Sequence, residues 1–311
     1  MKFFAFFTAL TAPAAVIAGG LQVATETEAE TYGPTKQADA VYATFGVHNP
    51  PAYSPCQVPG CVYHRAEGEP SNPLFPPQWQ SEWTMYTVTA GYQDNPPPYP
   101  LDIGSVDGLE YTTSYGATFY DSTFEHPDFP GEGAMMEYYD EKCLPIFPID
   151  NSFSCAFISL GDTAYFLTYD DRPEGMPDCC LFSSLNHPPR RDFVKHLPYS
   201  VADSTRTYLP GVQAYSLTTP GPGGAPILFG YAFNSAYTVD DAADATLKTP
   251  YRHPNQFYFS GSPTIPPNAP IVTQIYTGFM STPPTPEDTW NQVGDMCTAE
   301  PLPKCKLFSG G

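Results

Sequence analysis

The sequence predicts an all-β protein built on a large curved antiparallel sheet, as an open barrel or a sandwich, with only short helices. The chain of 311 residues contains 38 prolines, which interrupt helices because proline lacks the backbone N–H. It also contains 22 tyrosines and 21 phenylalanines, which favour half-buried pleated strands. About ten strand-like segments, separated by turn residues and without a fixed repeat, complete the pattern of a single β domain.

The first 78 residues precede the predicted domain. Residues 1–18 combine a basic start at Lys2 with an apolar run, and Val16 and Ala18 occupy the two cleavage positions of a secretory signal peptide. Pro13 and the modest length of the run argue against the alternative, a membrane anchor. We therefore expect a secreted, extracellular protein without a membrane span. Residues 19–78 are polar and rich in proline, which indicates a lead-in rather than a separate core.

A single β domain is predicted over residues 79–297, followed by a C-terminal tail over residues 298–311. The expected strands are residues 81–90, 111–120, 133–139, 155–160, 163–169, 212–219, 227–233, 235–239, 255–261 and 270–279. The strand over 81–90 has bulky side chains on both faces, so we expect both faces to be covered. Short helices are expected over residues 190–197 and 240–248.

Eight cysteines in an exported chain indicate disulfide bonds rather than thiol chemistry. The short spacings suggest two local disulfides, one joining Cys56 to Cys61 and one joining Cys297 to Cys305. The other four cysteines then bridge the middle of the chain: Cys143, Cys155, Cys179 and Cys180. Adjacent cysteines are poorly placed to bond each other, because their Cα atoms are too close. We therefore expect the adjacent pair to connect one strand or loop to two different neighbours.

The charge of the chain restricts its partners. Acidic residues outnumber Lys and Arg by 33 to 13, giving a formal net charge of −20, so nucleic acid is not an expected partner. Solubility outside the cell explains this charge, and calcium or a cationic partner is also compatible with it. The segment YDDRPEGMPD offers the best calcium ligands, with solvated turns as the alternative. These candidate ligands are Asp170, Asp171, Glu174 and Asp178. No other cofactor is predicted.

The sequence does not predict an enzyme. It lacks the G-x-S-x-G, H-E-x-x-H and C-x-x-C patterns, a phosphate loop and a dinucleotide fingerprint. Paired carboxylates need no fixed motif, so a secreted hydrolase is the less favoured alternative. The segment EYYDEKC offers Glu137, Asp140 and Glu141 for such a pair, against the simpler interpretation of a solvated rim beside Cys143.

A small basic patch stands out in this acidic chain. Arg190, Arg191 and Lys195 supply three of its thirteen basic residues within six positions. One interpretation is that they neutralise nearby carboxylates. The other is that they bind an anionic headgroup at the mouth of a pocket.

Several features follow the same order as in the secreted ependymin-related proteins and the wider group of LolA-like lipoprotein carriers. The matching pieces are Trp79 and Trp83, the strand end Phe119-Tyr120-Asp121, Cys155 with AYFLTYDD, Asp178-Cys179-Cys180, and the segments ILFGYAF, NQFYFSG and QIYTGF before Cys297. The chain departs from the pattern at Tyr231, where a tryptophan is often found, and in lacking an N-x-S/T glycosylation site. The resemblance implies a curved sheet around a deep apolar pocket for a lipid or other hydrophobic ligand. Calcium binding and a homodimer are compatible with it.

Aromatic and methionine side chains in the predicted strands are the candidates to line a ligand pocket, with plain core packing as the alternative for each. They are Trp83, Tyr86, Tyr115, Phe119, Met135, Phe166, Phe229 and Phe257. The sequence thus predicts a secreted, disulfide-bonded protein that binds a lipid or other hydrophobic ligand in a β-lined pocket. A structural or interaction protein of an extracellular matrix or cell wall is the main alternative, because a Pro-rich, Tyr-rich, acidic and disulfide-bonded chain suits such a surface component.

Overall fold

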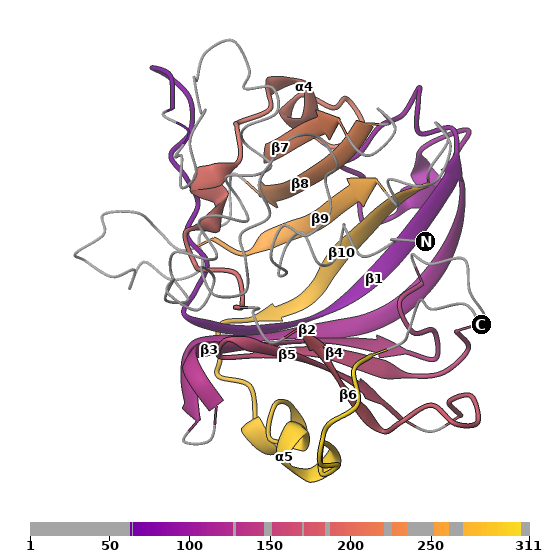
Figure 1. Ribbon diagram of the computed structural model, residues 1–311. Helices are drawn as coiled ribbons and strands as arrows, with labels where there is room; N and C mark the ends of the chain where they lie inside the picture. The colour runs from indigo at the N-terminus through magenta and orange to yellow at the C-terminus, as the bar shows by residue number, and fades with distance from the viewer. Residues whose placement is uncertain are drawn as a thin grey trace.

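The structure is a computed structural model that describes residues 63, 65–126, 129–145, 151–169, 171–183, 187–220, 226–234, 252–260 and 270–305. These residues form one ten-stranded antiparallel sheet in the order β6-β5-β4-β3-β2-β1-β10-β9-β8-β7 (Figure 1). The sheet bends strongly but does not close into a barrel, since β6 and β7 are its two outer strands. The predicted fold class, a large curved antiparallel sheet, is confirmed.

The strand order follows from two runs of neighbouring hairpins that meet at β1. The first run is β1 (Gln78–Ala90), β2 (Glu110–His126), β3 (Phe129–Asp140), β4 (Cys155–Leu160), β5 (Thr163–Thr168) and β6 (Cys179–Ser183). The second run is β7 (Val212–Pro220), β8 (Pro226–Asn234), β9 (Pro254–Ser260) and β10 (Ile271–Met280). The last strand of the second run pairs with β1, which therefore lies in the middle of the sheet.

Short helical elements lie outside the sheet. They are η1 (Ile103–Ser105), η2 (Phe193–His196), α4 (Val201–Ser204), η4 (Pro286–Asp288) and α5 (Gln292–Met296). The helix predicted over residues 190–197 is present only as the short η2, whereas α4 and α5 were not predicted. The predicted strand at 235–239 and the helix at 240–248 lie outside the described residues. In the part of the chain that the structure describes, no helix has the length and apolarity needed to cross a membrane.

One face of the sheet, the inner side of the curve, carries the main core. Alternate residues of β1, among them Trp79, Trp83 and Met85, are buried there. Trp83 fits because Gly116 lies opposite it on β2. A Cβ atom at position 116 would lie only 2.4 Å from the Trp83 ring, so only glycine leaves room for this indole.

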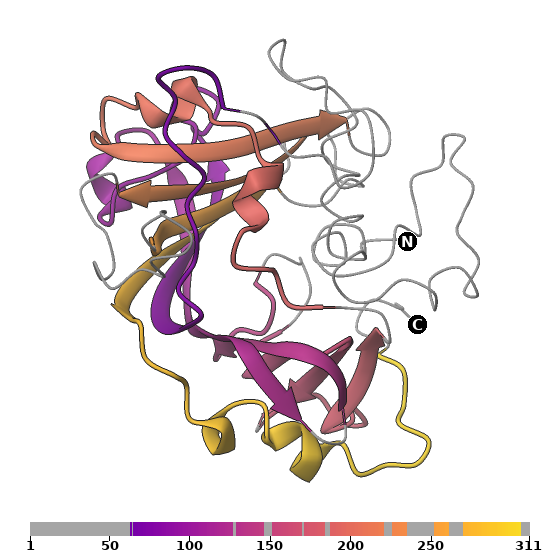
Figure 2. The same cartoon turned by 90° about the vertical axis from the view of Figure 1, so that its left-hand side faces the viewer.

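Two segments outside the sheet cover this inner face (Figure 2). Residues 65–77 run beside residues 187–200, and the N–H of Phe75 donates to the carbonyl oxygen of Arg191 at 2.9 Å. Phe75 and Phe193 are 3% and 1% exposed, and their rings lie 5.0 Å apart within the core. The segment predicted as a proline-rich lead-in therefore supplies core side chains already before residue 79.

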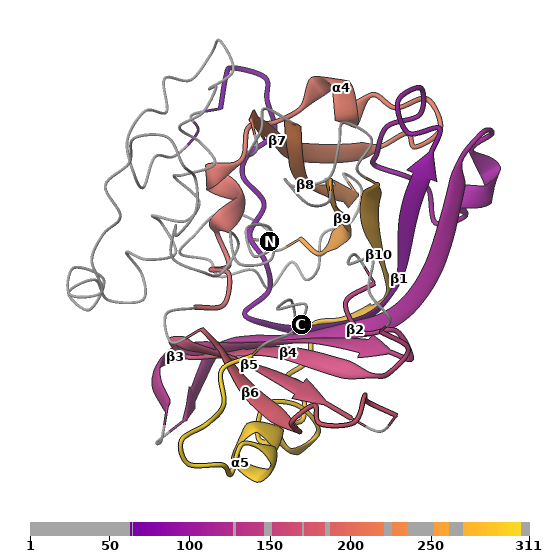
Figure 3. The same cartoon turned by 45° about the vertical axis from the view of Figure 1, so that its right-hand side comes forward.

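Three elements pack on the outer face of the sheet in the part of the chain that the structure describes. At one end α5 packs on the first run of strands, where Trp290 and Val293 join a buried cluster with Met136 and Ile158. At the other end α4 packs on β7 (Figure 3). Between the two ends, the segment that carries η1 supplies Tyr99 and Ile103 to a buried cluster with Val88 of β1 and with Ile271 and Ile275 of β10. The outer face of β1 and β2 between these helices carries several exposed side chains, including Tyr115 at 58% exposure.

Both outer strands are protected, which limits edge-to-edge aggregation. Beside β7, the N–H of Ser200 donates to Ala214 O at 2.8 Å. Beside β6, the N–H of Leu181 donates to Pro303 O at 2.8 Å, and the N–H of Cys305 donates to Leu181 O at 3.0 Å. The C-terminal tail thus extends along the edge of β6.

The disulfide bonds explain how the tail is held. Cys143 pairs with Cys155, Cys179 with Cys297, and Cys180 with Cys305. The expectation that the adjacent cysteines join different neighbours is confirmed, because side chains of consecutive strand residues point to opposite faces. The predicted local disulfide between Cys297 and Cys305 is wrong, and so is the expectation that Cys179 and Cys180 pair within the middle of the chain. The segment after α5 passes the edge of β6 and places Cys297 and Cys305 on opposite faces of the sheet. Residues 1–18, Cys56 and Cys61 lie outside the described residues.

Candidate functional site

A pocket of about 700 Å³ opens on the outer face of the sheet, next to α5. This volume lies within the range of about 300–1,000 Å³ that is usual for small-molecule sites. Strands β2 and β3, the turn before β4, the end of β5 and the segment leading into α5 all contribute side chains. The lining residues are Phe119, Met136, Tyr138, Glu141, Ser152, Phe153, Ser154, Tyr169, Asp171, Asp288 and Gln292.

The floor of the pocket is apolar and aromatic. Phe119 lies opposite Met136 in the pairing of β2 with β3, so the two side chains share one face. Tyr138 follows two residues further along that face, and its ring meets that of Tyr169 edge to face at 5.8 Å between centroids. The hydroxyl of Tyr169 donates to Gln292 Oε1 at 2.8 Å, which ties the start of α5 to β5. Burial raises the pKa of Tyr169, so its hydroxyl stays neutral at physiological pH.

The rim of the pocket is acidic. The exposed residues Glu141, Asp171 and Asp288 stand around the opening. Glu141 and Asp171 have φ angles of 54° and 63°, in the left-handed region that costs energy for residues other than glycine. They are two of the three non-glycine residues with positive φ in the described chain. The N–H of Glu141 donates to Ser154 Oγ at 2.9 Å, which helps to hold this conformation.

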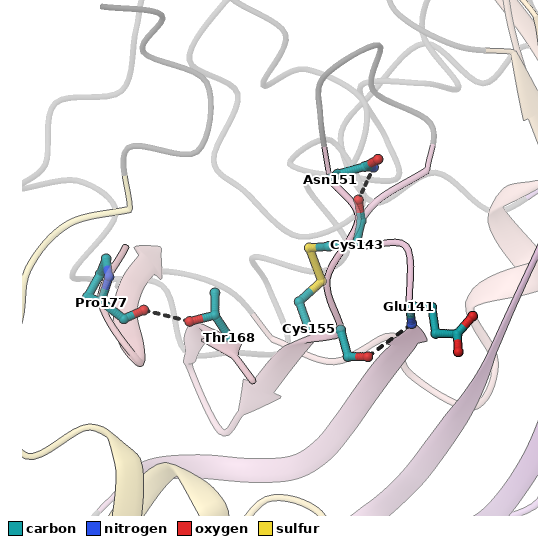
Figure 4. The surroundings of a disulfide bond; sticks show 7 residues. Glu141, Cys143, Asn151, Cys155, Thr168 and Pro177 are labelled. Atoms are coloured by element: carbon teal, nitrogen blue, oxygen red, sulfur yellow. Dashed lines mark hydrogen bonds between the residues drawn. A yellow bond between two sulfur atoms is a disulfide. The ribbon is translucent and has the colours of Figure 1, made fainter. Parts of the chain in front are cut away.

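The wall of the pocket beside β4 is fixed by covalent and hydrogen bonds (Figure 4). The disulfide between Cys143 and Cys155 joins the turn after β3 to the start of β4. The side chain of Asn151 donates to the carbonyl oxygen of Cys143, and the N–H of Cys143 donates back to Asn151 O at 2.9 Å. The hydroxyl of Thr168 donates to Pro177 O at 2.7 Å. These bonds keep the wall in place without help from a ligand.

The predicted ligand-binding residues divide between the two faces of the sheet. Tyr86, Tyr115 and Phe119 lie on the outer face, and of the eight only Phe119 lines the pocket. The remaining five belong to the inner face: Trp83, Met135, Phe166, Phe229 and Phe257. There they pack among other core rings; Phe229 and Phe257, for example, lie 5.1 Å apart. The structure therefore does not bring the eight residues together, and the inner five act as core in the described chain.

Glu137 is a buried carboxyl in the middle of this inner face. Thr118 Oγ1 donates to its Oε1 at 2.9 Å, and Gln274 Nε2 donates to its Oε2 at 3.0 Å. Burial raises the pKa of Glu137 to about 7, although both hydrogen bonds favour its charged form. The indole of Trp83 is close enough to favour the carboxylate as well, but its N–H lies outside hydrogen-bond geometry.

The predicted carboxylate pair does not form one site. Glu137 is buried on the inner face, whereas Asp140 is exposed at the end of β3 and pairs across the sheet with Tyr115 on the outer face. Glu141 belongs to the rim of the pocket. These carboxyls therefore do not flank a common substrate position.

The basic patch lies in the segment that covers the inner face. Arg190 Nε lies 3.8 Å from Asp192 Oδ1, and Lys195 Nζ lies 2.9 Å from Asp192 Oδ2. Arg191 Nε donates to the carbonyl oxygen of Phe75 at 2.9 Å. These contacts fit the interpretation in which the patch neutralises a nearby carboxylate and fastens residues 65–77.

The predicted calcium ligands lie around the turn between β5 and β6. Asp178 forms an ion pair with Arg172, whose Nε also donates to Met176 O at 3.1 Å. Asp171 stands on the pocket rim, Glu174 is exposed, and Asp170 lies outside the described residues. Within the described chain, no three His, Cys, Asp or Glu side chains are grouped closely enough to hold a metal ion. Calcium binding stays a prediction that the described residues do not support.

Most of the pocket was missed by sequence reasoning. Tyr138 and Tyr169 stand in predicted strands, but their outward direction depends on the register of the sheet. Asp288 and Gln292 follow the last strand and reach the pocket only because the segment after β10 folds back under the sheet. No short motif connects these positions.

Comparison with protein-family models and with curated proteins finds no match to this chain. The pocket and its surroundings are therefore interpreted from their own chemistry.

Proposed function

We propose that this protein is a secreted, extracellular binding protein that takes a hydrophobic small molecule into the pocket between β2, β3, β5 and α5. The observation that carries the proposal is the combination of about 700 Å³ of space with an aromatic and methionine floor. Such a floor binds the apolar part of a ligand, because it removes apolar surface from water. The rigid wall around Cys143 reduces the ordering cost of binding.

The rim selects the polar end of the ligand. Glu141, Asp171 and Asp288 place negative charge around the opening, so a positively charged or hydroxyl-bearing end is favoured and an anionic headgroup is disfavoured. The basic patch is not among the lining residues and has Asp192 as its partner. We therefore propose an apolar ligand with a cationic or neutral end in place of an anionic lipid.

Two further observations support the proposal: signs of export support the extracellular location, and the family resemblance supports ligand binding. Three disulfide bonds in the described chain suit an oxidising compartment, and residues 1–18 have the composition of a signal peptide. The resemblance to ependymin-related and LolA-like proteins implies ligand binding on a curved sheet. Those proteins are expected to enclose the ligand within the curve, whereas the pocket proposed for this chain lies outside it.

A titration with three amphiphiles of equal chain length tests the proposal. Dodecyltrimethylammonium, dodecyl maltoside and dodecyl sulfate differ only in their polar ends, and native mass spectrometry of the secreted protein measures each below its micelle concentration. We expect the cationic ligand to bind most tightly and the anionic ligand least. Equal binding of all three, or a preference for the sulfate, would contradict the proposed role of the rim.

Two variants connect the binding to the pocket. Tyr138→Ala removes half of the aromatic pair and should weaken binding of the cationic ligand about tenfold, since burying one aromatic face contributes on the order of 1–2 kcal/mol. Asp288→Asn should reduce the preference for the cation about fivefold. Asp295→Asn, an exposed carboxylate of α5 outside the lining, is the matched control and should bind like the wild type. Unchanged binding by Tyr138→Ala would exclude this pocket.

A further inference from the structure

Five tyrosines form a zigzag series on the outer face of the sheet, which we call the tyrosine band: Tyr111, Tyr86, Tyr115, Tyr138 and Tyr169. The rings of Tyr86 and Tyr111 meet edge to face at 5.4 Å between centroids, and those of Tyr138 and Tyr169 at 5.8 Å.

The register of the sheet joins these two pairs through Tyr115. Tyr115 lies opposite Thr84 on β1, so Tyr86 is its diagonal neighbour on one side. It lies opposite Asp140 on β3, so Tyr138 is its diagonal neighbour on the other. Diagonal neighbours on one face are about 7–8 Å apart, so the path from ring to ring along the band adds up to roughly 25 Å.

The band is exposed where it leaves the pocket. Tyr115 is 58% and Tyr111 is 38% exposed, whereas most large aromatic side chains of the described chain are buried. Tyr86 is half-buried between them, and burial raises its pKa above the ordinary value. Two exposed tyrosine rings on either side of a half-buried one form an aromatic patch, and exposed aromatic patches mark binding surfaces.

Polar groups flank the three central rings of the band. Thr84 and Thr113 lie opposite Tyr115 and Tyr86, and both threonines are at least partly exposed. The carboxylate of Asp140 accepts from the hydroxyl of Tyr138 at 3.4 Å, and Asp102 lies near Tyr86. Apolar ring faces beside hydroxyl and carboxylate groups match a sugar unit, which has a C–H face and a rim of hydroxyls.

The charge around the band excludes most other partners. Residues 66–141, which include β1, β2 and β3, contain no lysine or arginine, and Arg172 beside Tyr169 is paired with Asp178. Anionic polymers and anionic lipid surfaces therefore find no counter-charge along the part of the band on β1, β2 and β3. A second copy of this acidic chain would place carboxylates against carboxylates. A neutral polymer meets no such repulsion, and the carboxylates accept hydrogen bonds from its hydroxyls.

We infer that the tyrosine band is a binding surface for a neutral polysaccharide, whose sugar units stack on successive tyrosine rings from Tyr111 to the edge of the pocket. The inference extends beyond the proposed function, because Tyr111, Tyr86 and Tyr115 do not line the pocket. It places the protein on an extracellular glycan while the pocket remains open to a small ligand.

Affinity electrophoresis of the secreted protein tests the inference, with soluble neutral β-glucan, glycol chitin and xyloglucan in the gel and heparin as the anionic comparison. We expect retardation by at least one of the neutral polymers and none by heparin. The variant Tyr115→Thr keeps a good strand former at an exposed position, so it should fold normally and reduce the affinity about tenfold. Tyr115→Trp should retain binding, because it keeps an aromatic face.

Controls separate the band from the pocket and from general stickiness. Val201→Ala removes an exposed apolar side chain on α4, at 60% exposure, and should bind polysaccharide like the wild type. Tyr115→Thr should still bind the small cationic amphiphile, so failure of one proposal is distinguishable from failure of the other. Absence of retardation by all neutral polymers, unchanged retardation of Tyr115→Thr, or binding to heparin alone would overturn the inference. A dimer that depends on Tyr115 in analytical ultracentrifugation would overturn it in favour of self-association.

Discussion

Replacing Glu137 by glutamine tests the energetic effect of a carboxyl group buried in an aromatic core. Glutamine has nearly the same shape and can keep hydrogen bonds to Thr118 and Gln274 after its amide is oriented suitably. It removes only the ability to ionise. The variant therefore isolates the linkage between protonation of Glu137 and folding.

The magnitude follows from the pKa of Glu137, which burial raises from 4.5 to about 7. One unit corresponds to about 1.4 kcal/mol, so the group changes the free energy of unfolding by about 3 kcal/mol. Because the pKa is raised in the folded state, the folded protein binds the proton more tightly than the unfolded chain. The stabilisation is therefore fully present below about pH 4.5, is lost as the pH rises to about 7, and stays lost above that.

Urea unfolding followed by tryptophan fluorescence from pH 4 to pH 8, with the disulfide bonds intact, measures this effect. The difference in unfolding free energy between wild type and Glu137→Gln should shift by about 3 kcal/mol in favour of the variant as the pH rises. His253, whose pKa is lowered by burial, destabilises the fold as the pH falls, but it titrates in both chains and cancels in the difference. Glu82→Gln, at an exposed position of β1, is the matched control. A difference that does not change with pH would refute the buried, neutral state of Glu137.

Two further predictions concern packing and the tail. Gly116→Ala places a Cβ atom 2.0 Å from the carbonyl oxygen of Tyr138 and should destabilise the protein by about 2–3 kcal/mol in urea unfolding. Its control Gly294→Ala has open space around the new atom and should be neutral or slightly stabilising, so an equal loss for both variants would contradict the close approach of Trp83. Replacing Cys180 and Cys305 together by alanine should cost about 2.5 kcal/mol, because the bond between Cys179 and Cys297 leaves only a short additional loop to close. An unchanged free energy of unfolding in the same assay would mean that the tail is held by its backbone contacts to β6 alone.

The strands could be predicted from the sequence because their signals are local. Tyr- and Phe-rich segments bounded by proline and glycine coincide with β1 to β5 and β7 to β10, and the pair Cys179-Cys180 indicated two separate disulfide partners. The segment around Phe75 was harder to interpret, since its prolines suggest a linker. Its phenylalanine nevertheless completes the core between Trp79 and Phe193.

The faces of the strands, and with them the site, could not be predicted. β1 carries large side chains on both sides, so alternation alone does not distinguish Trp83 on the inner face from Tyr86 on the outer face. Which face is covered depends on the long-range pairing of β1 with β10 and on segments that fold back over the sheet. Long-range contacts also bring Asp288 and Gln292 to Tyr169. The pairing of Cys297 and Cys305 was predicted wrongly from their short spacing, because each cysteine bonds to β6, far away in the sequence.

A crystal structure of the secreted protein with dodecyltrimethylammonium tests the central claim most directly, because it locates the ligand. We predict that the alkyl chain lies on the outer face against Phe119, Met136 and the Tyr138–Tyr169 pair, with its ammonium group among the carboxylates of the rim. A ligand found instead within the curve of the sheet, against Trp83 and Phe257, or an empty outer pocket at saturating ligand, would contradict the account.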